Sequence, residues 1–101
     1  MSMFKFNEEW IQSERDTNLY YIKTDLIPIK FGNNNIVSCQ AVVTYNKKKD
    51  TKQTDIRIIR GYTQKDNGDI RLRKAVSLPP DKEVGIEIIK QLIDLYELEE
   101  E

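Results

Sequence analysis

Four stretches of the chain have the composition of strands, and a fifth repeats its apolar residues at helical spacing. The extended stretches are residues 19–31, 36–45, 54–63 and 70–78, which are rich in β-branched and aromatic residues. The helical stretch begins after Pro79-Pro80-Asp81 and runs to about Glu97. The pattern predicts an α+β fold of order ββββα, a four-stranded antiparallel meander followed by one C-terminal helix.

Residues 36–45 alternate most clearly. Their odd positions are apolar and predict the core face, whereas the even face is mixed: Val37, Cys39, Ala41, Val43 and Tyr45 are the odd residues. Cys39 is the single cysteine of the chain, so no internal disulfide can form, and its place in this series predicts a buried structural thiol. Tyr20 and Tyr21, in the preceding stretch, point to opposite faces, so we expect one buried and one exposed ring.

The last two extended stretches are less regular. Residues 54–63 have no clean face, and Gly61 is a candidate for a β-bulge. In residues 70–78 the apolar positions Ile70, Leu72, Val76 and Leu78 share one side, while Lys74 interrupts the series. Arg71 and Arg73 are therefore expected on the face away from the core.

The connections carry recognisable turn residues. Pro28 predicts an edge, a bulge or a break within residues 19–31, and residues 31–35 have turn composition. Asp66-Asn67-Gly68-Asp69 predicts a type I′ hairpin turn that pairs the third and fourth stretches. Residues 46–53 contain four lysines and nothing to bury, which predicts an exposed, mobile loop: Lys47, Lys48, Lys49 and Lys52.

The predicted helix has an apolar arc of roughly half its circumference, wider than the ~100° stripe of a simple surface helix. Two explanations remain open. The helix is either embedded deeply on its own sheet, or packs one flank on the sheet and the other on a second subunit. In the second case the dimer interface would contain Gly85, Ile86, Ile89, Ile93 and Tyr96, with Gly85 permitting close approach.

The chain of 101 residues predicts one domain, 1–101. Residues 1–18 are the least regular part: Asn7-Glu8-Glu9 favours a short N-terminal helix, and a strand through Phe4 and Phe6 is the alternative. Trp10 is interpreted as a core or interface anchor rather than a base-stacking residue. The acidic tail, residues 98–101, is expected to fray.

Charge is segregated along the sequence. From Lys47 to Lys74 the chain has ten basic residues and four acidic ones, whereas from Ala75 onward it has two basic and eight acidic residues. The net charge of −1 conceals this division. The folded protein is therefore expected to have a basic region, where a polyanion could bind, and an acidic region.

Several functional classes are disfavoured by composition. Histidine is absent, which removes the commonest general base and metal ligand, and the glycines are too scattered for a phosphate loop. Carboxylates with magnesium are the remaining catalytic route, but most of the eight acidic residues after Ala75 fall on the polar side of the helix or in the tail. We therefore expect no enzyme activity, no cofactor and no metal site. Without a signal peptide or a membrane-spanning apolar run, the interpretation is an intracellular protein of the cytoplasm, or of the nucleoid or nucleus if it binds DNA.

The C-terminal half resembles a known family. Asp55-Ile56-Arg57, the turn Asp66-Asn67-Gly68-Asp69, the run Arg73-Lys74-Ala75-Val76-Ser77-Leu78-Pro79 and the helix are similar to the positive cofactor four family of single-stranded-DNA-binding transcriptional coactivators, and more loosely to the Whirly proteins. Ala75 replaces a family glycine, and the helix lacks the tryptophan of many members. The resemblance implies a curved antiparallel sheet, helices packed in a homodimer, and single-stranded DNA or RNA bound along the sheets with little sequence preference.

The chemistry of the basic region agrees with that implication, because guanidinium groups pair with phosphates and tyrosine rings stack on bases. The candidate binding residues are Arg57, Arg60, Tyr62, Arg71, Arg73 and Lys74, together with Lys47, Lys48, Lys49 and Lys52 of the loop. Each has an ordinary alternative: Arg71 and Arg73 as surface residues paired with Asp55 or Asp69, Tyr62 as core, and the lysines as solubilising groups. The alternative function is a small protein-interaction module or inhibitor, of viral or mobile-element type, acting through the acidic helix.

Overall fold

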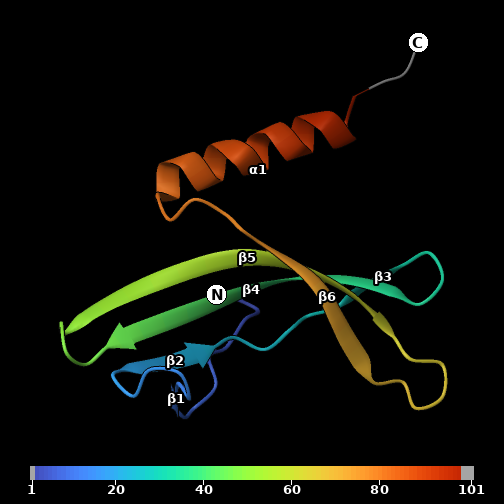
Figure 1. Ribbon diagram of the computed structural model, residues 1–101. Helices are drawn as coiled ribbons and strands as arrows, with labels where there is room; N and C mark the ends of the chain where they lie inside the picture. The colour runs from blue at the N-terminus through green and yellow to red at the C-terminus, as the bar shows by residue number, and fades with distance from the viewer. Residues whose placement is uncertain (1, 99–101) are drawn as a thin grey trace.

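The computed structural model describes residues 2–98, which form one antiparallel sheet and one C-terminal helix (Figure 1). The strands are β1 (Ile11–Gln12), β2 (Leu19–Lys23), β3 (Ile29–Phe31), β4 (Asn35–Asn46), β5 (Thr51–Thr63) and β6 (Ile70–Ser77), and the helix is α1 (Lys82–Tyr96). The predicted α+β class with a C-terminal helix is confirmed. The predicted number of strands is wrong, since the sheet has six rather than four.

The stretch 19–31 divides into two strands that share one edge of β4. The sheet order is β1-β2-β4-β5-β6, with β2 on the second half of β4 and β3 on its first half. Pro28 has no N–H to donate to a ladder, and residues 25–28 leave the sheet between β2 and β3. Of the three alternatives expected at this proline, an edge, a bulge or a break, the structure has the break, which creates the first of the additional strands.

The N-terminal segment is extended, and the expected short helix is absent from residues 2–18. β1 pairs with β2, and Phe6 forms an isolated bridge with Thr24. The amide of Asn7 donates to the Lys23 carbonyl at 2.8 Å. Pairing with the free edge of β2 satisfies backbone groups that the weak capping signal of this segment could not satisfy in a helix.

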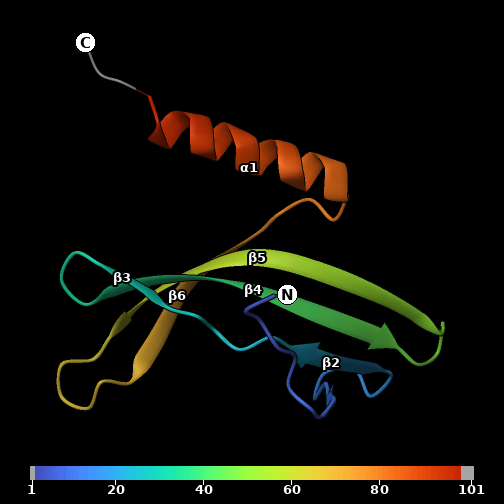
Figure 2. The same cartoon turned by 180° about the vertical axis from the view of Figure 1, so that it is seen from behind.

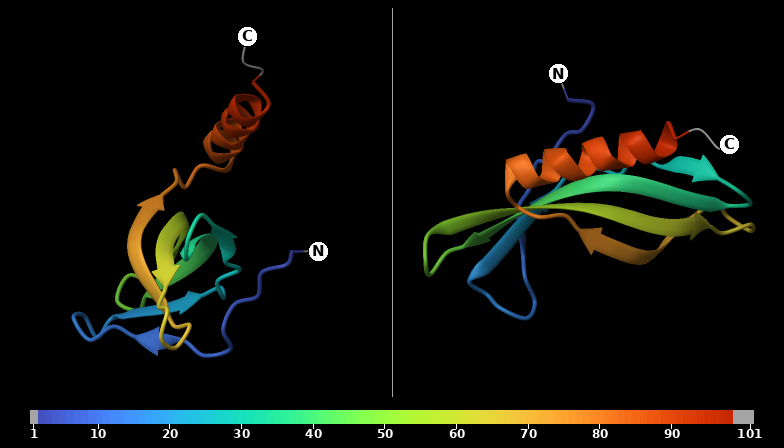
Figure 3. Two further views of the ribbon diagram at one scale, coloured as in Figure 1. Left: turned by 90° about the vertical axis from the view of Figure 1, so that its right-hand side faces the viewer. Right: turned by 90° about the horizontal axis from the view of Figure 1, so that it is seen from above.

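Burial along β4 is the reverse of the prediction. The buried residues are the even-numbered Ile36, Ser38 and Val42, whereas Cys39 is exposed. The sheet is strongly twisted and curved (Figure 3), and residues 24–28 cover the even face, where the Ile27 amide donates to the Ser38 hydroxyl at 2.8 Å. This covering segment decides which of two partly apolar faces is buried.

The bulge expected at Gly61 is confirmed. The register of β5 and β6 shifts between Arg60 and Gly61, so that Arg60 pairs with Lys74 and Gly61 with Leu72. Arg73 is the additional residue on β6, and it shifts the alternation of that strand. Leu72 and Val76 consequently project to opposite faces, which corrects the single apolar face predicted for residues 70–78.

Both hairpin connections differ from expectation. β5 begins at Thr51, so the lysine loop contains only residues 47–50, and Lys52 is a strand residue. Asp50 adopts a positive φ of 51° to close this turn. The second connection spans residues 64–69, and within it only Gly68 has a positive φ, at 74°. A type I′ turn requires two such residues, so the predicted turn type is wrong although the pairing is right.

Helix α1 begins where the sequence predicted. The Asp81 side chain is the N-cap and accepts hydrogen bonds from the amides of Glu83 and Val84. The helix stands away from the sheet (Figures 1 and 2), and within the described chain no Cα atom of α1 lies within 8 Å of a strand Cα atom. Both predicted explanations of its wide apolar arc require packing on its own sheet, which does not occur in the protomer. The predicted frayed tail lies largely outside the described residues.

The protomer has a very small core. Among residues 2–98 the buried apolar side chains are Ile36, Val42 and Ile59, although 39% of the chain is hydrophobic. No residue of α1 is buried. The accessible surface is 8838 Å², against about 6,000 Å² for a compact monomer of this mass. The radius of gyration is 16.4 Å, against about 13 Å for a compact domain.

Candidate nucleic-acid interface

The strand register assigns each side chain to one of two faces, because opposite residues of an antiparallel pair project to the same side. The core face carries Ile36, Ser38, Val42 and Ile59. We call the other side the aromatic face. It carries the cross-strand pairs Tyr20 with Tyr45, Tyr45 with Lys52, Arg60 with Lys74, and Tyr62 with Arg71.

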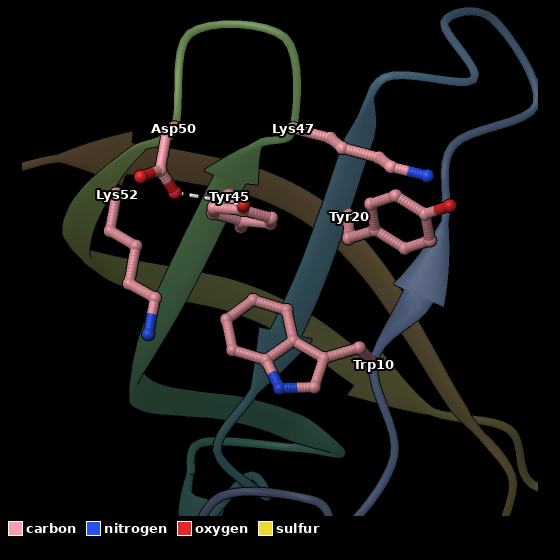
Figure 4. A pocket seen from close by; sticks show the side chains of 6 residues that line it. All are labelled: Trp10, Tyr20, Tyr45, Lys47, Asp50 and Lys52. Carbon is pink, nitrogen blue, oxygen red and sulfur yellow. Dashed lines mark hydrogen bonds between the residues drawn. The ribbon is translucent and has the colours of Figure 1, made fainter.

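One end of the aromatic face contains an open pocket of about 580 Å³ beside the turn between β4 and β5 (Figure 4). Its aromatic lining is Trp10, Tyr20 and Tyr45, with Trp10 and Tyr45 edge to face at a centroid distance of 6.4 Å. The Lys52 ammonium lies 5.7 Å from the centre of the Trp10 ring. The remaining lining residues are Lys47 and Asp50.

Hydrogen bonds hold two of these rings. The Tyr45 hydroxyl donates to Asp50 Oδ1 at 2.9 Å, and this hydrogen bond to a carboxylate raises the pKa of Tyr45. The Gln12 amide donates to the Tyr20 hydroxyl at 3.4 Å and to the Thr17 carbonyl at 2.9 Å. The pocket is thus assembled from β2, β4 and the segment that leads into β1.

A second cluster occupies the other end of the aromatic face. The Arg60 guanidinium lies 5.3 Å from the centre of the Phe31 ring, and the Arg73 guanidinium lies 5.2 Å from that of Tyr62. Phe31 comes from β3, and Arg73 is the bulge residue of β6. Lys52 and Arg60 are eight positions apart along β5, which corresponds to about 26 Å of extended strand. Cation–π pairs therefore stand at both ends of one sheet face.

The positive charge of this face is not neutralised by neighbouring carboxylates. Among residues 2–98 the single ion pair within 4.0 Å joins Lys90 and Glu87 on α1. Within residues 2–98 neither Arg71 nor Arg73 forms an ion pair with its expected alternative partners, Asp55 and Asp69, and Asp55 accepts a hydrogen bond from Ser77 at 3.1 Å. A face with exposed cations and no paired anions attracts polyanions over several ångströms.

The structure brings most of the predicted binding residues together. Lys52, Arg60, Tyr62, Arg71, Arg73 and Lys74 belong to the aromatic face, while Lys47 reaches its pocket from the turn. Lys48 and Lys49 are exposed in the same turn. Arg57 is separated from the others, because it pairs with Gln40 on the core face, where its buried Nε has no hydrogen-bond partner.

Four aromatic residues of this face were missed by the sequence interpretation: Trp10, Tyr20, Tyr45 and Phe31. Trp10 is 41% exposed, which is inconsistent with a core anchor. Tyr20 and Tyr21 are both half-buried, so the expected contrast between them is wrong. Tyr45 stands at an odd position of β4, and the alternation predicts that the odd positions face the core. Its place on the aromatic face therefore does not follow from the sequence pattern.

Residues 2–98 contain no group of three or more acidic or cysteine side chains arranged to hold a metal ion. None of their helices has the length and apolarity needed to cross a membrane. No protein-family model, curated protein or solved structure matches this chain.

Proposed function

We propose that this protein binds single-stranded DNA or RNA along the aromatic face, with little sequence preference. The observation that carries the proposal is the presence of cation–π pairs at both ends of one exposed sheet face, without carboxylate partners in residues 2–98. Lysine and arginine side chains would contact phosphates, and exposed rings would stack on bases, which every base permits.

The geometry favours a single strand over a duplex. Stacking on Trp10, Phe31 or Tyr62 requires bases with free faces, and a paired duplex offers only groove edges and phosphates. A curved sheet face about 26 Å long between the two clusters suits several nucleotides, within the roughly 4–16 nucleotides bound by other sheet-based modules.

Fluorescence anisotropy of a labelled single strand and its duplex, at several salt concentrations, tests this function. We expect tighter binding of the single strand, weakening as salt rises. Arg60→Ala and Arg73→Ala should each reduce affinity, and each lost phosphate contact should lower the salt slope by about 0.7. Arg15→Ala, which removes the same charge from the loop after β1, is the matched control. An absence of binding even at low salt would refute the proposal.

We further propose that the protein is a homodimer, in which a second copy covers α1. The protomer exposes about 2,900 Å² more surface than a compact monomer of its mass, which is ample for the 800 Å² or so that each partner of a standard interface contributes. Both flanks of the helix are uncovered, including Val84 and Leu92 on one and Ile86, Ile89 and Ile93 on the other. Gly85 and Tyr96 lie within the same arc.

A second copy is the occupant that these features support. A second copy of the chain carries the same uncovered apolar arc on its own α1. In a two-fold dimer the two arcs can pack against each other, so one interface buries both. The polar side of α1 is acidic, so that side would remain in solvent. The mass of the protein in solution tests this proposal separately from nucleic-acid binding.

A further inference from the structure

The pocket beside the β4–β5 turn has the dimensions of a small-ligand site. Its volume of about 580 Å³ falls within the range of roughly 300–1,000 Å³ typical of such sites. Three aromatic rings line it from separate segments, and Figure 4 shows Trp10, Tyr20 and Tyr45 gathered around the opening. Rings held on different strands can contact a flat ligand from more than one side.

The polar groups indicate the charge of that ligand. The Lys47 and Lys52 ammonium groups reach the pocket from either end of the turn, and Figure 4 shows them on opposite sides of it. Asp50 is the one carboxylate in the lining, and its Oδ1 is engaged by the Tyr45 hydroxyl. Two cations against one hydrogen-bonded carboxylate favour an anionic ligand over a cationic one.

The excess of cations over free carboxylates distinguishes this pocket from an aromatic cage for quaternary ammonium groups. Such cages also combine tryptophan and tyrosine rings with an acidic residue. Here, however, an internal cation already lies beside the Trp10 ring, because the Lys52 ammonium is 5.7 Å from the ring centre. A second cation placed there would meet like charge, whereas a phosphate would be attracted to the same ammonium.

We propose that this pocket is a nucleotide subsite, which takes one nucleobase against Trp10, Tyr20 and Tyr45 and the adjoining phosphate beside the Lys52 ammonium, with Lys47 as a second cation at the opposite side. The inference rests on the proposed function and deepens it, because it gives the strand a fixed point of attachment at one end of the aromatic face. The remaining nucleotides would then follow the sheet toward Arg60 and Arg73.

Intrinsic fluorescence offers a direct test, since Trp10 is the single tryptophan of the chain. The full-length protein would be titrated with adenosine 5′-monophosphate, adenosine, inorganic phosphate and tetramethylammonium. We expect saturable quenching by the nucleotide, with weaker affinity for adenosine and for phosphate alone. Saturation by tetramethylammonium without a response to the nucleotide would overturn the assignment.

Variants separate the base contact from the phosphate contact. Trp10→Ala should weaken binding of a labelled single strand by roughly 5- to 150-fold, the range expected for loss of one stacked base. Lys52→Gln should remove the preference for the nucleotide over adenosine while leaving adenosine binding in place. Lys82→Gln, at the start of α1, removes the same charge outside the pocket lining and is the matched control.

The outcomes distinguish this subsite from the function on which it rests. If a single strand binds and depends on Arg60 and Arg73, yet Trp10 fluorescence and Trp10→Ala affinity are unchanged, the subsite is refuted and the function stands. If no single strand binds, the function itself fails. Circular dichroism of Trp10→Ala shows whether the sheet is retained, and the Lys52→Gln comparison gives a second result should the tryptophan variant not fold.

Discussion

At the scale of single residues, Gly61 is required by the close approach of β6. A Cβ atom at this position would overlap the backbone carbonyl of Arg71, and neither strand can shift without disturbing the ladder. We expect Gly61→Ala to lower the free energy of unfolding by about 1–3 kcal/mol, the usual cost of overpacking. Chemical denaturation measures this change. Gln53→Ala, at an exposed position of the same strand, is the control; equal destabilisation by both would contradict the argument.

Tyr45 lines the pocket and its hydroxyl has a raised pKa, so its titration is a probe of the pocket structure. Its hydrogen bond to Asp50 raises the pKa above the ordinary 10.0, so the folded state holds the phenolic proton more tightly than the unfolded state. The stability that this hydrogen bond contributes to the folded state is fully present below pH 10. It is lost as the pH rises through the raised pKa of Tyr45 in the folded state. Ultraviolet difference titration of the wild type against Tyr45→Phe should place the midpoint above 10. Asp50→Asn should move it downward, and an unchanged midpoint would show that the hydrogen bond does not form.

At the scale of elements, α1 depends on its cap more than a packed helix would. Isolated helices of about 12–15 residues are marginal in water, and α1 has 15 residues and no packing within the protomer. Asp81→Ala removes the acceptor of two amide hydrogen bonds and should cost about 1 kcal/mol of helix stability. Far-ultraviolet circular dichroism should therefore show loss of helical signal. Gln91→Ala, on the polar arc, should not reduce it, and an unchanged Asp81→Ala spectrum would contradict the role of the cap.

Elements with strong local signals were predictable from the sequence. The Asp81 cap, the break at Pro28 and the bulge at Gly61 each follow from the chemistry of one residue. The N-terminal strand β1 was not predictable, because it exists through pairing with β2 rather than through its own composition. The length of the lysine loop was misjudged for the same reason: Lys52 has no strand propensity, and its place in β5 comes from pairing with Tyr45.

The face that forms the core lay beyond sequence reasoning. β4 carries apolar residues on both sides, so its pattern permits either side to be buried. Residues 24–28 determine which side of β4 is buried, because they cover Ser38. Nothing in their own sequence indicates where they fold. The candidate site was affected directly, since assigning Tyr45 to the core concealed its pairing with Tyr20. The basic residues of the site were predictable, because the segregation of charge can be seen in the sequence without knowledge of the strand register.

At the scale of the whole molecule, the three buried apolar side chains found in residues 2–98 are too few to stabilise a domain of this length. Folding and assembly are therefore expected to be coupled, with stability that rises with protein concentration. Light scattering should give the mass of two chains. Dilution should lower both the mass and the midpoint of thermal unfolding together.

A charge placed on the apolar arc of α1 tests which surface makes the dimer. Ile89 is 48% exposed in the protomer, so Ile89→Glu should cost an isolated chain little. In a dimer it would bury an unpaired carboxylate, which is strongly unfavourable. We expect this variant to be monomeric and less helical, while Gln91→Glu, which adds the same charge to the polar arc, should remain dimeric. A wild-type protein that is monomeric at every concentration would exclude a second copy as the cover of α1 and leave that arc open to a different protein.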